Sequence, residues 1–210
     1  MGTRAFTRHV SDATGCETSP VSRGGVVIVD YDPAWPERAS ALIHTLARAL
    51  GDTARRIDHI GSTSIPGMAA KDVLDIQVGV DDLDDAVAAF DEPLRALGFT
   101  LRPFDRDHVP AGCADDQSLW VKRFWSRRGS ADGDVNLHVR RVGSPNERLA
   151  LLFRDWFRAH PSAIPAYAAF KRSLAGAVPD GGVYSDVKDP VVDLVVVIAE
   201  TWARHTSWSP

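Results

Sequence analysis

Hydrophobic and polar residues alternate most clearly in the run VLDIQVGV, residues 73–80. A period of two predicts a strand whose apolar side chains share one face, while Asp75 and Gln77 share the other. Two residues along a strand are about 7 Å apart, so both polar side chains can reach one cleft. A buried carboxylate is costly unless it is paired or bound to a metal. Asp75 is therefore the first candidate site residue, with a structural role beside the preceding turn as the alternative.

The remaining apolar periodicity predicts helices and strands on both sides of this strand. The predicted helices cover about residues 34–50, 81–97, 145–160 and 164–177, and a last one runs from Asp186 or Asp189 to about residue 204. The other predicted strands cover about residues 26–31, 54–60, 99–102, 119–127 and 135–142. We expect an α+β fold with a mixed sheet packed by helices on one face. The C-terminal helices are expected to form a lid or a second layer.

Two helix starts and one apolar helix face give further predictions. Ser144 and Glu147 have the spacing of a capping box at the start of a helix. Ser162 is expected to cap the next helix. The last helix carries an apolar stripe that we expect to be buried, made of Val191, Leu194, Val195 and Ile198.

The length and composition of the chain predict its domain organisation. A chain of 210 residues with 44% hydrophobic residues is long enough to bury one core. Residues 25–206 are expected to form this single domain. Residues 1–24 are rich in Ser, Thr, Gly and Arg without apolar periodicity, which predicts a flexible tail.

Charge and cysteine content narrow the possible partners and the compartment. A net charge of −4 gives no electrostatic reason to expect binding to nucleic acid. No apolar run reaches the roughly 18 residues that a membrane span needs, and the N-terminus has no signal-peptide pattern. Cys16 and Cys113 make neither a disulfide framework nor a cysteine-rich zinc site. These features predict a protein of the reducing cytoplasm.

A turn of small residues precedes the alternating strand. The sequence HIGSTS places Gly61, Ser62 and Thr63 directly after an apolar residue. Backbone N–H groups in such a turn can bind an anion, with help from the hydroxyl groups. If the turn folds back beside the strand, a phosphate cradle and Asp75 meet in one cleft. The alternative is that Ser62 only caps the turn.

The string HIGSTSIPGMAAKDVLDIQV resembles the GrpB-like family of the nucleotidyltransferase superfamily, as do the later segments VNLHVRRVGSPNE and FRDWFRAHPSAIPAYAAFKRSLA. The resemblance covers about residues 26–205. It implies a nucleotidyltransferase-like sheet in which the Gly-Ser turn holds nucleotide phosphates and acidic strand residues hold Mg²⁺. The implied ligand is a nucleotide or another phosphorylated small molecule. The implied reaction, if there is one, is phosphoryl or nucleotidyl transfer, with Asp75 holding the divalent ion.

The chain departs from the pattern of an active nucleotidyltransferase in two places. Gln77 stands where a second carboxylate is expected, and Asn136 and His138 occupy the later strand where a third is expected. Two-metal chemistry needs anionic oxygens to hold hard cations. The sequence therefore predicts a nucleotide-type cleft more firmly than nucleotidyl transfer. A binding module that has lost catalysis is the alternative.

Three cations are candidates for contacts with phosphate groups. Lys71 lies just before the strand and can either contact a phosphate or pair with Asp75. Arg154 and Lys171 lie in the family-like helical segments, and Arg154 shares a helix face with Arg158. Basic side chains above an acidic cleft can clamp polyphosphates. The alternative is ordinary solvated helix charge.

Two histidines are candidates for a catalytic base. His59 precedes the Gly-Ser turn, and His138 shares a predicted strand face with Asn136. Either one can also be structural. A third hypothesis is a small-molecule enzyme that uses histidine chemistry, with Asp75, His59 and His138 as ligands of a transition metal.

Overall fold

The computed structural model describes residues 25–178 and 180–210. The predicted N-terminal tail lies outside the described residues. The helices are α1 (Trp35–Leu50), α2 (Leu83–Ala96), α3 (Pro145–Ala159), α4 (Ile164–Ala177) and α5 (Gly181–Thr206). The strands are β1 (Arg56–Ile60), β2 (Val73–Val80), β3 (Thr100–Arg102), β4 (Lys122–Arg127) and β5 (Asp134–Arg141).

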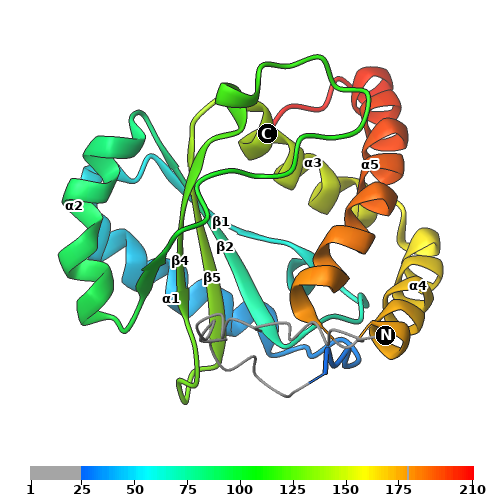
Figure 1. Ribbon diagram of the computed structural model, residues 1–210, viewed down its shortest axis with the longest axis horizontal. Helices are drawn as coiled ribbons and strands as arrows, with labels where there is room; N and C mark the ends of the chain where they lie inside the picture. The colour runs from blue at the N-terminus through cyan, green and yellow to red at the C-terminus, as the bar shows by residue number, and fades with distance from the viewer. Residues whose placement is uncertain (1–24, 179) are drawn as a thin grey trace, which may run out of the picture.

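The five strands form one mixed sheet in the order β1-β2-β5-β4-β3. β2 and β5 are parallel, and the other neighbouring pairs are antiparallel. Helices α1 and α2 lie on one side of the sheet, and α3, α4 and α5 lie on the other (Figure 1). The prediction of an α+β fold with a mixed sheet and a layer of C-terminal helices is confirmed.

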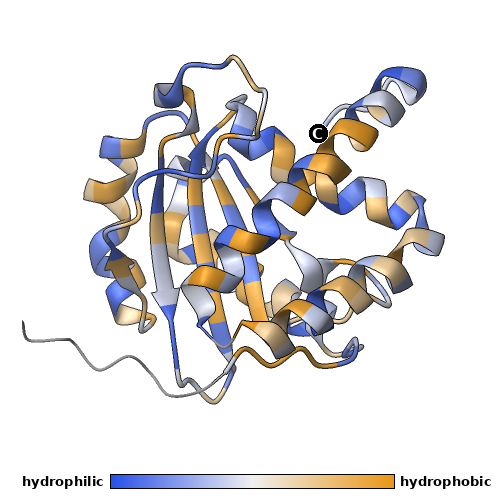
Figure 2. Ribbon diagram, turned by 45° about the vertical axis from the view of Figure 1, so that its right-hand side comes forward, coloured by the Kyte–Doolittle hydropathy of each residue, from blue (hydrophilic) through white to orange (hydrophobic). Residues whose placement is uncertain are grey.

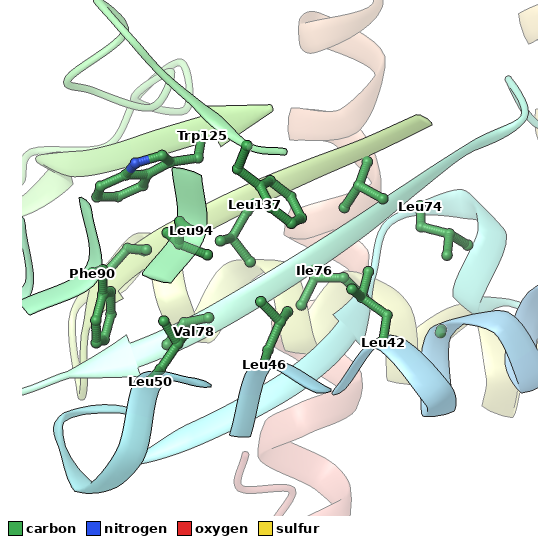
Figure 3. Packing of buried hydrophobic residues seen from close by; sticks show 14 of the residues in the cluster. Leu42, Leu46, Leu50, Leu74, Ile76, Val78, Phe90, Leu94, Trp125 and Leu137 are labelled. Atoms are coloured by element: carbon green, nitrogen blue, oxygen red, sulfur yellow. The ribbon is translucent and has the colours of Figure 1, made fainter. Parts of the chain in front are cut away.

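The alternation in β2 separates the main core from the polar side of the sheet. Leu74, Ile76 and Val78 are almost fully buried and pack among apolar side chains of α1 and α2 (Figure 3). Full burial of such a side chain contributes roughly 1.5–3 kcal/mol. Figure 2 shows the same alternation of apolar and polar positions along the strands. The opposite face of β2 is therefore free to carry polar residues.

A second apolar cluster holds the C-terminal helices together. Phe153, Phe157 and Tyr167 pack their rings edge-on or tilted, with centroids 5.0–5.7 Å apart. Ala199 of α5 belongs to the same cluster. Aromatic pairs in this geometry contribute about 0.5–1.5 kcal/mol beyond area burial. The cluster fixes α4 and α5 above the polar face of the sheet.

Two predicted strands differ from the structure. Residues 26–31 form no strand and make only a bridge between Val29 and Ala70. Val27 is 68% exposed, so this apolar run lies on the surface instead of pairing along the sheet. At the start of β4, Gln117–Trp120 forms a 3-10 turn instead of strand. The Asp116 carboxylate accepts a hydrogen bond from the Ser118 N–H, which favours the turn.

Ser144 is the N-cap residue of α3, as predicted, but the predicted capping box there and the predicted cap of α4 at Ser162 are wrong. The Ser144 hydroxyl donates to the Arg141 carbonyl and to Asn146 Oδ1 and makes no hydrogen bond to the N–H groups of the helix. Glu147 Oε2 accepts from the Gly143 N–H, one residue earlier than a capping box requires. Ser162 lies inside a short 3-10 turn before α4.

The last helix begins earlier than predicted, and a different face of it is buried. Asp180 Oδ1 accepts hydrogen bonds from the N–H groups of two residues in the first turn. This cap lets the helix start before Pro190, which lies inside it. Leu194 and Ile198 are 66% and 55% exposed, so this half of the predicted stripe is wrong, whereas Val191 and Val195 are half-buried and pack against the C-terminal apolar cluster. The fully buried positions of this helix are Tyr184, Asp193, Val196, Ala199 and Ala203. Across the described residues, every helix falls short of the length and apolar character that crossing a membrane requires.

Candidate functional site

The turn after β1 lies directly against Asp75. The antiparallel register pairs Ile60 with Asp75, and the chain then bends at Gly61, whose φ is 68°. A Cβ atom on Gly61 would lie only 2.4 Å from Asp75 Oδ2. The Ser64 hydroxyl donates to the Gly61 carbonyl and closes the turn. The structure thus brings the Gly-Ser turn and the strand carboxylate together, as the sequence suggested.

A cavity of about 440 Å³ opens beside this contact. The turn, including Ser62 and Thr63, lines one side, and Asp75, Asn136 and His138 line the sheet side. Helices α4 and α5 close the cavity from above, with a mixture of basic, aromatic and apolar side chains. We call this cavity the cleft.

Asp75 is held by donors from the neighbouring parallel strand. Asn136 Nδ2 donates to Asp75 Oδ1 at 2.7 Å, and His138 Nε2 lies 3.6 Å from the same oxygen. Arg128 donates to Asn136 Oδ1 at 2.5 Å and so fixes the orientation of the amide. Burial raises the pKa of Asp75, but the contacts with His138 and Asn136 outweigh burial and hold the pKa below its ordinary value. Asp75 is therefore ionised at neutral pH.

The ring of His138 lies between Asp75 and two basic side chains. Its Nδ1 is 3.5 Å from Lys122 Nζ and 3.4 Å from Arg140 Nη2. Both neighbours can only donate, so Nδ1 accepts and the ring proton lies on Nε2, toward Asp75. Burial and the charges of Lys122 and Arg140 together lower the pKa of His138 to about 4, although the contact with Asp75 raises it. This geometry favours a neutral donor that positions Asp75 over the predicted role as a base.

Gln77 is sealed beneath this site. Its side chain is 0% exposed. Its Oε1 accepts from Arg140 at 2.5 Å, and its Nε2 donates to the Glu147 carbonyl at 3.3 Å.

Asp107 is the carboxylate partner of the two cations behind His138. It accepts hydrogen bonds from Arg140 at 2.8 Å and from Lys122 at 2.6 Å. Burial alone would raise the pKa of Asp107, but these two cations hold it far below its ordinary value.

The Asp107 cluster was missed by sequence reasoning. Asp107 lies in a long loop without periodicity, so nothing local points to a contact with the sheet. One signal was available, because Lys122 and Arg140 are opposite each other in the register of the β4–β5 hairpin. Two facing cations in a sheet need a nearby anion.

Three lysines line the cleft: Lys71 just before β2, Lys171 of α4 and Lys188 of α5. Lys171, which is 2% exposed, donates from Nζ to Ser62 Oγ at 2.9 Å. Burial, together with the nearby charge of Lys188, lowers the pKa of Lys171 to about 7. Lys71 Nζ lies 4.3 Å from the centroid of the Tyr184 ring. Lys188 has a carboxylate partner, whereas Lys71 and Lys171 make no ion pair within the described part of the chain.

Arg154 does not line the cleft. It donates to Asp155 at 2.7 Å and to the His59 carbonyl at 3.2 Å. Arg158 donates to the Ser64 carbonyl at 2.7 Å. The two arginines thus attach α3 to the outer side of the turn.

His59 also lies away from the cleft. It pairs with Ile76 in the register and therefore faces the other side of the sheet from Asp75. Its Nε2 contacts Thr63 Oγ1 at 2.9 Å, and burial lowers its pKa to about 4. The three proposed transition-metal ligands are therefore not brought together. Over residues 25–178 and 180–210, no three His, Cys, Asp or Glu side chains are grouped to hold a metal.

The donor set also does not fit the two-ion site that the resemblance implies. Mg²⁺ requires oxygen ligands, with charged carboxylates preferred. Asp75 is the only carboxylate among the residues that line the cleft. The amides of Gln77 and Asn136 stand at the other strand positions and already bond arginines. No reaction step through a metal follows from this geometry.

The fold and the cleft define an α+β protein with a basic pocket beside a Gly-Ser turn. The chain belongs to the GrpB family, whose sequence model, described as GrpB protein, matches residues 25–197. The predicted family is thereby confirmed.

Relatives and a solved structure agree with this assignment. A UPF0157 protein of Halalkalibacterium halodurans is 33% identical over 167 residues, which cover 80% of this chain and 77% of that protein. A dephospho-CoA kinase of Mycolicibacterium paratuberculosis is 37% identical over 221 residues, covering 97% of this chain but 53% of the kinase. The chain thus spans about half the length of the mycobacterial relatives it matches. The crystal structure of conserved protein GrpB from Enterococcus faecalis has a TM-score of 0.67 at 24% identity, covering 84% of this chain and 99% of that one, and so has the same fold.

Proposed function

We propose that this chain binds a phosphorylated small molecule, such as a nucleotide, in the cleft. Lys171 carries the proposal. It is a buried amine whose hydrogen-bond partner in the cleft is the neutral Ser62 hydroxyl. Burying an ammonium without a counter-ion costs several kcal/mol. An anionic ligand would supply the missing charge, and Ser62 would donate a further hydrogen bond to it.

The charge around the cleft supports the same conclusion. The whole chain has four lysines, and three of them line the cleft, together with Arg128. Asp75 is the one carboxylate that faces them among the lining residues. The chain as a whole has a net charge of −4, so this excess of positive charge is local. A ligand with two or more negative charges would complement it.

The remaining walls suit the organic part of such a ligand. Phe153, Val192 and the ring of Tyr167 line the cleft beside the basic groups. Ligand sites commonly combine apolar walls with a few placed polar groups. Aromatic and aliphatic walls of this kind can hold a base or a ribose while the lysines hold phosphate. The proposal is therefore a binding function. It includes no transfer reaction, because Asp75 is the one carboxylate among the lining residues and metal-dependent transfer uses several.

A calorimetric titration tests the proposal. The ligands would be inorganic pyrophosphate, ADP, ATP and dephospho-CoA, the last because of the name that the mycobacterial relatives carry. The proteins would be the wild type, Lys171→Met and the control Arg48→Met, which removes an exposed cation from α1 on the other side of the sheet.

The wild type and the control are expected to bind at least one ligand of this set. Lys171→Met is expected to weaken that binding tenfold or more, because a hydrogen bond to a charged group contributes about 1.5–3 kcal/mol and ~1.4 kcal/mol is a factor of ten. Failure of all four ligands to bind the wild type would overturn the proposal. Equal affinity of Lys171→Met and wild type would do the same.

A further inference from the structure

We infer, on the basis of the proposed function, that the cleft binds phosphate groups without a divalent cation. Fixed side-chain cations would supply the positive charge that the resemblance to nucleotidyltransferases assigns to Mg²⁺. Three separate features of the polar face of the sheet support this inference: the environment of Gln77, the cations behind His138, and the partners of Asp75.

The side chain of Gln77 makes structural hydrogen bonds and is not available as a metal ligand. Its amide is fully buried and saturated at both ends, by Arg140 and by the Glu147 carbonyl. A metal at this position would have to displace a guanidinium from Oε1 at 2.5 Å. The neutral amide would then offer the metal no charge in return. The second ligand position of a two-metal site is therefore closed.

Two buried cations stand directly behind the site. Lys122 and Arg140 both approach His138 Nδ1 within 3.5 Å, and the single carboxylate of Asp107 neutralises only one of their two charges. The field of a buried charge is weakly screened. A divalent ion on Asp75 would be repelled by this cluster, whereas an anion in the cleft would be attracted. The electrostatics of the sheet thus oppose a metal and favour a bare phosphate.

One oxygen of Asp75 is already engaged by side chains of the neighbouring strand. Its Oδ1 accepts from Asn136 and faces the Nε2 of His138, while its Oδ2 lies against the turn at Gly61. A chain of contacts from Arg128 through Asn136 holds this carboxylate in place. Asp75 therefore acts as the anchor of the turn and of the strand network. Its negative charge opposes phosphate binding instead of promoting it through a metal.

The lysines that line the cleft supply the charge that a metal ion would otherwise supply. Lys171 lies at the turn itself, and Lys71 and Lys188 lie further along the same cleft. An ammonium group is a compact point charge that can contact a phosphate from several directions. Such a site is ready before the ligand arrives and needs no cation from solution.

The experiment is a titration of inorganic pyrophosphate into the wild type in EDTA and, separately, in millimolar Mg²⁺. We expect the dissociation constant in EDTA to equal the value in Mg²⁺ within about threefold, or to be lower, because Mg²⁺ neutralises part of the charge of pyrophosphate. The variant Asp75→Asn keeps an acceptor for Asn136 and removes the like charge. It is expected to bind pyrophosphate in EDTA at least as tightly as the wild type, with its fold checked by a thermal melt.

The outcomes separate this inference from the proposed function. Binding that appears only with Mg²⁺, or that Mg²⁺ tightens tenfold or more, would overturn the inference and leave the proposed function standing. Loss of binding in a folded Asp75→Asn variant would count against the inference in the same way. Absence of pyrophosphate binding in both buffers would overturn the inference, and the proposed function would fall with it only if ADP, ATP and dephospho-CoA also failed to bind. The comparison of buffers needs only the wild type, so it decides the question even if Asp75→Asn does not fold.

Discussion

Replacing Lys171 with methionine is expected to stabilise the protein while it weakens anion binding. Methionine has a similar length and fills the same space without a charge. The pKa of Lys171 falls from 10.5 to about 7 in the folded protein, chiefly because of burial. One pKa unit corresponds to ~1.4 kcal/mol, so the buried charge costs the folded state up to about 5 kcal/mol. Loss of the hydrogen bond to Ser62 offsets about 1 kcal/mol of the gain.

The size of this stabilisation depends on pH in a defined direction. The folded pKa of Lys171 lies below the unfolded value, so the unfolded chain binds more protons between about pH 7 and pH 10.5. The stability of the wild type relative to Lys171→Met therefore rises with pH across this window. The advantage of the variant is expected to be at most about 4 kcal/mol at pH 6 and about 1 kcal/mol at pH 9.

Urea unfolding at pH 6 and pH 9 measures this effect, with fluorescence of the six tryptophans as the signal. The control Arg48→Met should stay within about 0.5 kcal/mol of the wild type at both pH values, because it changes an exposed position. A Lys171→Met variant that is less stable than the wild type at pH 6 would refute the reasoning. So would a difference in stability that is the same at both pH values.

Three further changes test other parts of the account. Gly61→Ala is expected to lower the free energy of unfolding by about 1–3 kcal/mol, measured by urea unfolding, because at its positive φ the new Cβ would clash with Asp75. The control Gly67→Ala has a φ of 80° but open space around it, so its free energy of unfolding should fall less. Asp107→Ala is expected to cost about 3–5 kcal/mol at neutral pH by leaving two buried cations unpaired. The pKa of Asp107 is depressed, so this loss should shrink only below its unfolded pKa of 3.8, and a constant loss down to pH 2 would contradict the assignment. Acetylation followed by mass spectrometry should show that pyrophosphate protects Lys171, and equal rates with and without pyrophosphate would count against the cleft as its site.

The parts of the fold with strong periodicity were predicted well from the sequence. The strand at 73–80 has the predicted limits because its apolar residues alternate with polar residues and glycine. The meeting of Gly61 and Asp75 also followed from local order, since a turn that connects two paired strands must return beside one of them. These features rest on short-range geometry.

The parts that failed depend on contacts that local spacing does not encode. Arg154 was placed on the correct helix, but the helix faces the outer side of the turn, and only tertiary packing decides that. His59 faces away from Asp75 because of strand parity, which the register of β1 and β2 fixes. Asp107 reaches the sheet from a loop without periodicity. Pro190 suggested a helix start, whereas the helix begins at Gly181 after a cap at Asp180 and continues through the proline.

A crystal structure of the wild type soaked with pyrophosphate in EDTA tests the central claim most directly. The account predicts phosphate oxygens within hydrogen-bonding distance of Lys171 Nζ and Ser62 Oγ. Pyrophosphate bound elsewhere on the molecule, with the cleft between the turn and α4 left without it, would contradict the claim.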